Sequence, residues 1–171
     1  LEQQLLHIVG EHMVADVPVG AFLSGGIDSG LLVAMMARLQ RERGGGQLKT
    51  FTIGFGAEGQ FMDETARAAD IAHQVGAGHR VIRVGADLAV ARFAHIVDQF
   101  DEPFANPTAL MLDLLCEGAR DEVTVAVTGD GGDEALSGYP RYRATRAFAL
   151  WQRLPALLRD NLLPNLAAQI P

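Results

Sequence analysis

The sequence has one cysteine, one lysine and no long uninterrupted apolar run. A single cysteine cannot form an internal disulfide, and such usage is typical of proteins in a reducing compartment. No apolar stretch approaches the roughly 18–20 residues that a membrane-spanning helix needs. The first residues also lack the basic region followed by an apolar region that marks a signal peptide. We therefore expect a cytoplasmic protein without a membrane partner.

Positive charge is scarce. Against 21 acidic residues there are 14 lysines and arginines, which gives a formal net charge of −7. A nucleic-acid-binding face is normally basic, so this class of partner is disfavoured. The five histidines show no metal-binding spacing such as H-E-x-x-H. The chain has 171 residues, 49% of them apolar, which suffices for one domain with a hydrophobic core.

Strand-like and helix-like periodicities alternate along the chain. Strands are expected at 17–23, 48–55, 79–84 and 122–129, and helices at 2–15, 28–43, 63–75, 86–100, 106–120, 141–153 and 155–168. Residues 130–142 are expected to form a long polar loop. This order predicts an α/β fold in which a parallel sheet is sandwiched by helices. In such sheets, ligands bind beyond the carboxyl ends of the strands.

The stretch AFLSGGIDSG contains the end of the first expected strand. The chain turns there on Gly25 and Gly26, and a helix begins near Asp28. Free N–H groups in the first turn of a helix favour anions, and glycine lets the backbone approach a ligand closely. Together with the Ser24 and Ser29 hydroxyls, this geometry suits a phosphate or pyrophosphate. The alternative is a plain tight turn capped by Asp or Ser, and plain turns are commoner than phosphate sites.

The Asp28 carboxylate would repel an anion bound at this turn. The repulsion disappears if a divalent cation lies between them, since Mg²⁺ is commonly held by one or two carboxylates together with phosphate oxygens. A second carboxylate is therefore expected, and Asp130, Asp133 and Glu134 follow the 122–129 strand. Two acidic loops could thus hold Mg²⁺ against the phosphates of a nucleotide. The alternative is a solvated acidic loop with helix-capping residues.

Other nucleotide and metal motifs are absent or incomplete. A Walker loop needs Gly-Lys-Ser/Thr, whereas Lys49 follows a leucine. Gly54, Gly56 and Gly59 spell G-x-G-x-x-G after a strand. No helix is expected to begin there and no acidic residue closes the next strand, so we interpret this segment as a flexible loop and a chance match. A calcium loop is excluded because Gly132 falls at a ligand position.

Three segments resemble a known family. FLSGGIDS resembles the pyrophosphate-binding loop of the N-type ATP pyrophosphatases, or PP-loop ATPases. TGDGGDEALSGYPRY resembles the second signature of the asparagine synthetases that use glutamine, and DEPFANPTAL resembles the loop and helix before it. The order and spacing agree over residues 1–155. The first motif is shared with several other synthetases, whereas the second is much more specific.

The resemblance implies an adenine nucleotide alpha hydrolase-like fold with C-terminal helices, and an ATP-dependent amidation of aspartate. In that chemistry the β-carboxylate of aspartate attacks ATP, pyrophosphate leaves, and ammonia converts β-aspartyl-AMP to asparagine and AMP. A glutaminase domain at the N-terminus releases the ammonia from glutamine. Because both ends of the chain fall inside helical patterns, we expect residues 1–171 to be a partial ATP-pyrophosphatase domain. The glutaminase domain and a C-terminal helical part would lie outside it, and the excerpt would be inactive alone.

The resemblance also implies roles for individual residues. Pyrophosphate would bind Ser24, Gly25, Gly26, Asp28 and Ser29, and Mg²⁺ would bind Asp28 and Asp133. The adenosine end would lie against Leu23, Ile53, Thr128 and Gly129, while Asp130 would act on the attacking ammonia and Tyr139 would close the site. Three positions depart from the commoner family pattern: Asn106 replaces Asp, Ala135 replaces Leu and Ser137 replaces Gly. These departures concern fine substrate contacts and leave the phosphate chemistry unchanged.

Two other functions stay open. A related PP-loop ligase could adenylate another carboxylate, as a β-lactam-forming synthetase does, or the chain could be a degenerate nucleotide-binding module. The acyl-acceptor pocket that would separate the ligases lies mostly beyond residue 171. The resemblance is also compatible with a homodimer. Cys116, in the 106–120 helix, is expected to be a buried structural thiol rather than a nucleophile.

Overall fold

A computed structural model of the protein describes residues 1–55, 63–101 and 106–155. The chain divides into two compact units, Leu1–Asp130 and Gly131–Pro171. The first unit contains α1 (Glu2–His12), β1 (Val19–Phe22), α2 (Ile27–Glu42), β2 (Lys49–Phe55), α3 (Thr65–Val75), β3 (Gly78–Val84), α4 (Ala86–Phe100), α5 (Pro107–Ala119) and β4 (Val125–Val127). The second unit contains α6 (Gly132–Leu136) and α7 (Pro140–Gln152). Within the described ranges, no helix is both long and apolar enough to cross a lipid bilayer.

The strands form one parallel sheet in the order β3-β2-β1-β4, which confirms the predicted α/β class. In the register of this sheet, Phe22 pairs with Phe51 and Ala21 pairs with Val127. From β1 the chain moves outward through β2 to β3, and it then returns to the opposite side of β1 with β4. The strand order therefore reverses between β1 and β4. In α/β sheets, ligands bind in the crevice at such a reversal, beyond the carboxyl ends of the strands.

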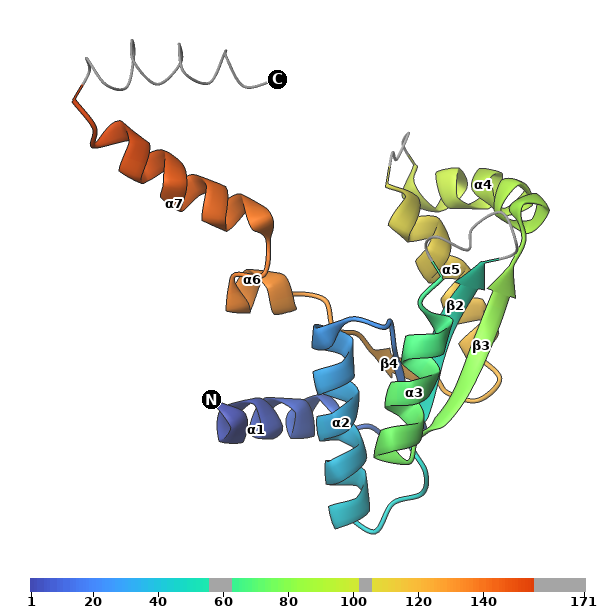
Figure 1. Cartoon of the computed structure of the whole chain (residues 1–171). Coiled ribbons are helices and arrows are strands. Elements are labelled where there is room, and N and C mark those ends of the chain that lie inside the picture. The colour runs from blue at the N-terminus through green and yellow to red at the C-terminus, as the bar shows by residue number, and fades with distance from the viewer. Residues whose placement is uncertain (56–62, 102–105, 156–171) are drawn as a thin grey trace. The chain divides into compact units, whose positions relative to one another are not determined.

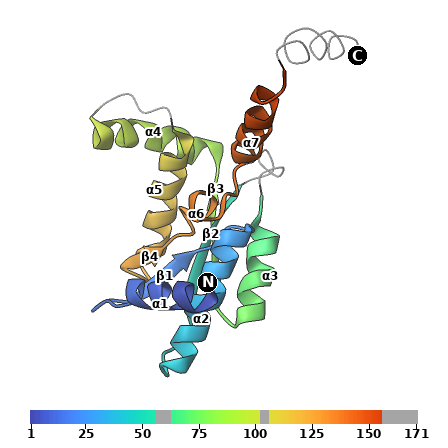
Figure 2. The same ribbon diagram turned by 90° about the vertical axis from the view of Figure 1, so that its left-hand side faces the viewer.

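Helices cover both faces of this sheet, as Figures 1 and 2 show. On one face lie α2 and α3, with α1 packed against α2, and on the other lies α5, with α4 packed against it. Side chains alternate along β1, as the two-residue period of a strand requires. Ala21 and Leu23 enter the core that includes Met36 of α2, whereas Phe22 joins Phe51 in the core that includes residues of α5. Burial on both faces thus fixes the end of β1 in the sheet.

The sequence predicts a loop over residues 130–142. Part of this segment is helical instead, because α6 forms within it. Asp133 and Glu134 lie in the first turn of α6, where acidic side chains interact favourably with the helix dipole. The residue before the helix, Gly131, has a φ of 91° that glycine adopts without strain. A short helix therefore orders part of the acidic segment.

Other differences from the expected elements are smaller. The strand expected at 122–129 is shorter, since only Val125–Val127 pairs with β1. The helix expected at 155–168 and the flexible loop expected at Gly56 and Gly59 lie, apart from residue 155, outside the described residues.

The expected burial of Cys116 is wrong, because its side chain is exposed. Successive residues of a helix are about 100° apart, so Cys116 lies about 200° around α5 from Leu114, which is buried. Partial desolvation and, after it, the Asp113 carboxylate raise the pKa of the Cys116 thiol. The thiolate that a nucleophile would need is therefore disfavoured at this position.

His79, at the start of β3, makes the stability of the first unit depend on pH. Its Nδ1 lies 2.9 Å from Thr50 Oγ1, while its buried Nε2 has no hydrogen-bond partner among the described residues. Burial lowers the pKa of the His79 imidazole below its ordinary value of 6.5. Below that pH the unfolded chain therefore binds a proton before the folded chain does, and folding stability falls as the pH falls.

We expect the unfolding free energy of the whole protein to decrease as the pH is lowered from 7 through about 6.5 and further. Denaturant titrations at several pH values would measure this slope. It should be smaller in His79→Gln and unchanged in His73→Gln, a control on the exposed side of α3. Equal slopes in all three proteins would contradict the assignment to His79.

Candidate functional site

The turn after β1 is held by its own two hydroxyls. Ser29 Oγ lies 2.8 Å from Ser24 Oγ and accepts a hydrogen bond from Ser24 N at 3.2 Å. Gly26 N donates to Ser24 Oγ, also at 3.2 Å. Ser29 is buried, with 8% of its surface exposed. The two serines that the sequence assigns to phosphate binding therefore also fix the shape of the turn.

Free N–H groups follow this turn at the start of α2. The first backbone hydrogen bond of the helix runs from Gly30 N to Gly26 O at 3.1 Å, so the N–H groups of Ile27, Asp28 and Ser29 have no carbonyl partner inside the helix. Gly26 caps α2 in an extended conformation and offers no side-chain cap. The positive end of the helix dipole lies at the same place. The start of α2 therefore suits an anion, as the sequence predicts.

The start of α3 contacts the same turn through a bond that was not predicted from the sequence. Glu64 Oε2 accepts a hydrogen bond from Gly25 N at 3.1 Å. A Cβ on Gly25 would lie 2.7 Å from the Arg67 Cβ and 3.2 Å from the Glu64 Cβ. Because no side chain fits there, glycine is required for this packing. The contact joins residues 39 apart in the sequence, and no local pattern announces it.

The Asp63 side chain hydrogen-bonds to the first residue of α3 and not to the turn after β1. Its Oδ1 accepts a hydrogen bond from Thr65 N at 2.8 Å. Hydrogen bonding to the Thr65 side chain and, after it, the bond to Thr65 N lower the pKa of the Asp63 carboxyl below its ordinary range. Asp63 thus satisfies a free N–H at the start of α3 and leaves the neighbouring Glu64 available to the turn.

The segment after β4 approaches the first turn of α2 at Gly129. A Cβ there would lie 2.8 Å from Ser29 N, 3.0 Å from Ser29 Cα and 3.2 Å from the Asp28 carbonyl carbon. All three are backbone atoms of α2, so only glycine allows the two segments to come this close. The end of β4 and the turn after β1 therefore lie together at the point where the strand order reverses.

Thr128 and Asp130 flank Gly129 and contact each other. Thr128 Oγ1 donates a hydrogen bond to Asp130 Oδ2 at 2.9 Å, and Asp130 N donates to Thr128 Oγ1 at 3.4 Å. Asp130 is exposed and Asp28 is half-buried. The first unit thus brings five of the predicted residue positions, Ser24, Asp28, Ser29, Thr128 and Gly129, to one edge of the sheet, with Asp130 next to them.

Leu23 and Ile53 do not both present their side chains to a ligand, as residues that line an adenosine site would. The Leu23 side chain is 1% exposed and lies in the core with Val33, so its backbone is the part left to contact a ligand. Ile53 lies on β2 opposite Ile82 and is half-buried. The Leu23 N–H is used in the sheet, where it donates to Phe51 O at 2.8 Å. Burial therefore limits what these apolar residues can contribute.

The remaining predicted residues, Asp133 and Tyr139, belong to the second unit. Tyr139 donates a hydrogen bond from its hydroxyl to Glu134 Oε1 at 2.8 Å, and this bond is the main reason why the pKa of the Tyr139 phenol is raised. Gly138 N donates to Asp133 O at 2.9 Å, and a Cβ on Gly138 would overlap the Asp133 carboxylate. A side chain at position 138 would therefore require the Asp133 carboxylate to move.

Ser137 explains why glycine is commoner at its position. It ends α6 with a φ of 60°, in the left-handed region. Glycine adopts this conformation without steric cost, whereas a residue with a Cβ pays roughly 1 kcal/mol. Ser137 therefore costs some stability in α6. The structure of Ala135 offers no comparable reason for the leucine that is commoner there.

Asp28 fits a magnesium site that is shared with a phosphate. Among the described residues, no group of three or more His, Cys, Asp or Glu side chains could hold a metal ion by itself. Mg²⁺ at a nucleotide needs only one or two carboxylates, because water and phosphate oxygens complete its shell. An aspartate beside free N–H groups at the start of a helix provides this type of donor set.

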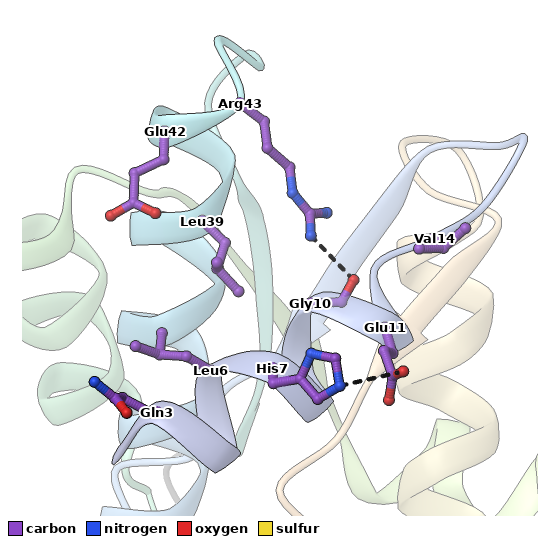
Figure 3. A pocket seen from close by; sticks show the side chains of 9 residues that line it. All are labelled: Gln3, Leu6, His7, Gly10, Glu11, Val14, Leu39, Glu42 and Arg43. Carbon is purple, nitrogen blue, oxygen red and sulfur yellow. Dashed lines mark hydrogen bonds and ion pairs between the residues drawn. The ribbon is translucent and has the colours of Figure 1, made fainter.

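An open hollow of about 540 Å³ lies between α1 and α2, away from this edge. Figure 3 shows Gln3, His7 and Glu11 of α1 along it, with Leu39 and Arg43 from the end of α2. Fifteen residues of helix separate its Arg43 from Asp28, which corresponds to about 22 Å along the axis. The hollow is therefore not part of the site at the sheet edge.

Comparisons with known proteins identify relatives over nearly the whole chain. A family model described as asparagine synthase matches residues 1–171. The glutamine-hydrolyzing asparagine synthetase 1 of Bacillus subtilis (strain 168) is 36% identical over 163 residues, which cover 95% of this chain and 24% of that protein. A putative glutamine-hydrolyzing asparagine synthetase of Mycobacterium tuberculosis (strain ATCC 25618 / H37Rv) is 40% identical over 154 residues, covering 90% of this chain and 22% of that protein. The chain thus spans about a quarter of the length of these relatives.

A solved structure shares the fold. The NH3-dependent NAD synthetase from Campylobacter jejuni subsp. jejuni NCTC 11168, in complex with a nitrate ion, superimposes with a TM-score of 0.51 and 15% sequence identity. The match covers 80% of this chain and 58% of that one. At this identity the likeness concerns the fold, and it confirms the predicted PP-loop ATPase architecture.

Proposed function

The chain belongs to the asparagine synthase family, and from this membership we propose that it supplies the ATP-consuming site of an enzyme that amidates aspartate. The enzyme would be an ATP-dependent carbon–nitrogen ligase. Because the chain spans about a quarter of its relatives, the activity is proposed for the whole protein. We propose that residues 1–171 are part of the ATP-pyrophosphatase domain and have little activity alone.

The approach of Gly129 to the first turn of α2 is the observation that carries this proposal. It brings a threonine and an acidic residue beside free N–H groups, where the strand order reverses. An ATP pyrophosphatase has to bind a triphosphate closely and neutralise the charge of a departing pyrophosphate, which requires N–H donors and carboxylates for a metal ion at one place.

Each predicted residue has a proposed role at this site. The N–H groups at the start of α2 and the Ser24 and Ser29 hydroxyls would hold the pyrophosphate part of ATP, on a turn formed by Gly25 and Gly26. Asp28 and Asp133 would hold Mg²⁺, which would supply positive charge against the phosphates. Thr128, Gly129, Ile53 and the Leu23 backbone would contact the adenosine end, Asp130 would act on ammonia, and Tyr139 would close the site.

The proposed chemistry proceeds in two steps. A β-carboxylate oxygen of aspartate attacks the α-phosphorus of ATP, the bond to the bridging oxygen breaks, and pyrophosphate leaves with its electron pair. Ammonia then attacks the carbonyl carbon of β-aspartyl-AMP, AMP leaves, and the nitrogen loses a proton. The chain's own contribution is to hold two anions close together and to orient them, which removes much of the entropic cost of the reaction.

The ammonia source is a further part of the proposal. Both relatives are named as glutamine-hydrolyzing enzymes, and we propose that a glutaminase domain of the same protein releases ammonia from glutamine. The single, exposed Cys116, whose thiol pKa is raised, does not suit that role. A cytoplasmic location agrees with the low cysteine content.

Exchange of labelled pyrophosphate into ATP by the whole protein, with Mg²⁺ and one carboxylic acid at a time, tests the function. We expect exchange with L-aspartate and none without an acid. Exchange with a different acid alone would replace aspartate by that acid and favour a related ligase. ATP binding without exchange for any acid would contradict the enzyme assignment and favour a degenerate nucleotide-binding module.

A further inference from the structure

Glu64 is placed to act on the turn rather than on its own helix. It occupies the position before α3, where a side chain often caps the helix, yet it makes no cap hydrogen bond. Asp63 supplies that bond through Thr65 N. The Glu64 carboxylate reaches instead to Gly25 N at 3.1 Å. The division of labour between two adjacent acidic residues leaves one of them for the phosphate-binding turn.

The bond to Glu64 is one of three hydrogen bonds that occupy the N–H groups of the turn and so determine which N–H groups stay available to a ligand. Of the three N–H groups before α2, that of Ser24 bonds Ser29 Oγ, that of Gly25 bonds Glu64 and that of Gly26 bonds Ser24 Oγ. The N–H groups that remain belong to the first turn of the helix. Without Glu64, the Gly25 peptide could rotate easily, because glycine has a wide range of allowed backbone conformations.

We propose that Glu64 is a positioning residue that holds the Gly25 peptide and thereby keeps the start of α2 directed at the phosphates of ATP. This inference rests on the proposed function. The close packing of the Arg67 side-chain carbons against Gly25 supports it, since Arg67 lies one helical turn after Glu64 and limits the space around the same residue.

Two variants of the whole protein separate positioning from other roles. Glu64→Ala removes the acceptor, whereas Glu64→Gln keeps an oxygen that can accept from Gly25 N. Calorimetric titration with Mg·ATP and with pyrophosphate, together with the KM values for ATP and aspartate and the melting temperature, would be measured for both. Asp70→Asn, an exposed change on α3, serves as the control.

Positioning predicts that Glu64→Ala weakens ATP and pyrophosphate binding about 5- to 10-fold, while Glu64→Gln stays within about twofold of the parent. The aspartate KM and the melting temperature should not change. If both variants bound ATP more tightly, Glu64 would be an anion that competes with phosphate, and the proposal would be overturned. A lower melting temperature, with ATP binding, pyrophosphate binding and the aspartate KM all impaired to the same extent, would show that Glu64 has only a structural role and would also overturn the proposal. Failure of the unmodified protein to bind ATP would overturn the proposed function together with this inference.

Discussion

Replacing Asp28 by Asn should reduce aspartate-dependent ATP–pyrophosphate exchange by the whole protein at least about 100-fold. Asp28 lies half-buried in the first turn of α2, beside N–H groups that have no carbonyl partner in the helix. The amide would remove a negative charge that the metal needs, because Mg²⁺ prefers carboxylate oxygens. The same change would also remove the repulsion between Asp28 and a bound anion. Binding of pyrophosphate without metal should therefore be no weaker in the variant than in the parent.

Asp70→Asn is the matched control for this result, since it makes the same chemical change at an exposed position of α3. It should leave exchange within about twofold of the parent. The melting temperature of Asp28→Asn should also be close to that of the parent, because Asp28 is not part of the core. Unchanged exchange in Asp28→Asn would remove the support for a metal at this residue.

Replacing Gly129 by Ala should strongly reduce both the stability of the protein and its exchange activity, for a steric reason. The new Cβ would meet Ser29 N at 2.8 Å and Ser29 Cα at 3.0 Å. These atoms belong to the backbone of α2 and cannot rotate away as a side chain could. We expect a loss of about 2 kcal/mol in unfolding free energy. Displacing the start of α2 by about 1 Å should also reduce exchange about 100-fold.

Gly46→Ala provides the comparison, because a Cβ at Gly46 would meet no atom within 4 Å and its φ is not positive. This variant should change the unfolding free energy by no more than about 0.5 kcal/mol. Denaturant titration and the exchange assay would be applied to both proteins. Parent-like stability and exchange in Gly129→Ala would contradict the close approach of the two segments.

The local parts of the site could be predicted from the sequence. The apolar run that ends at Leu23 and the helical period after Asp28 predict the strand and the helix, and a glycine–serine turn between them leaves the N–H groups of the helix start free. The parallel order of the elements then predicts the edge of the sheet at which the turn and Asp130 lie. These features depend on neighbours in the chain and on one general rule of topology.

The non-local parts could not be predicted in the same way. The bond from Gly25 to Glu64 connects segments on different elements, and its existence depends on how α3 packs beside α2. The exposure of Cys116 depends on which side of α5 faces the sheet, and an apolar helix sequence does not settle this. The helix α6 arises in a segment whose glycines and polar residues also suit a loop. The bond and the exposure of Cys116 thus depend on tertiary packing. For α6, the local sequence is compatible with both a short helix and a loop.

A crystal structure of the whole protein with Mg²⁺ and a non-hydrolysable ATP analogue tests the central claim most directly. The account predicts Mg²⁺ bound to carboxylate oxygens of Asp28 and Asp133 at about 2.1 Å. It also predicts phosphate oxygens within hydrogen-bond distance of the Ile27 and Asp28 N–H groups. Phosphates bound at another place, or a metal ion whose ligands do not include Asp28, would contradict it.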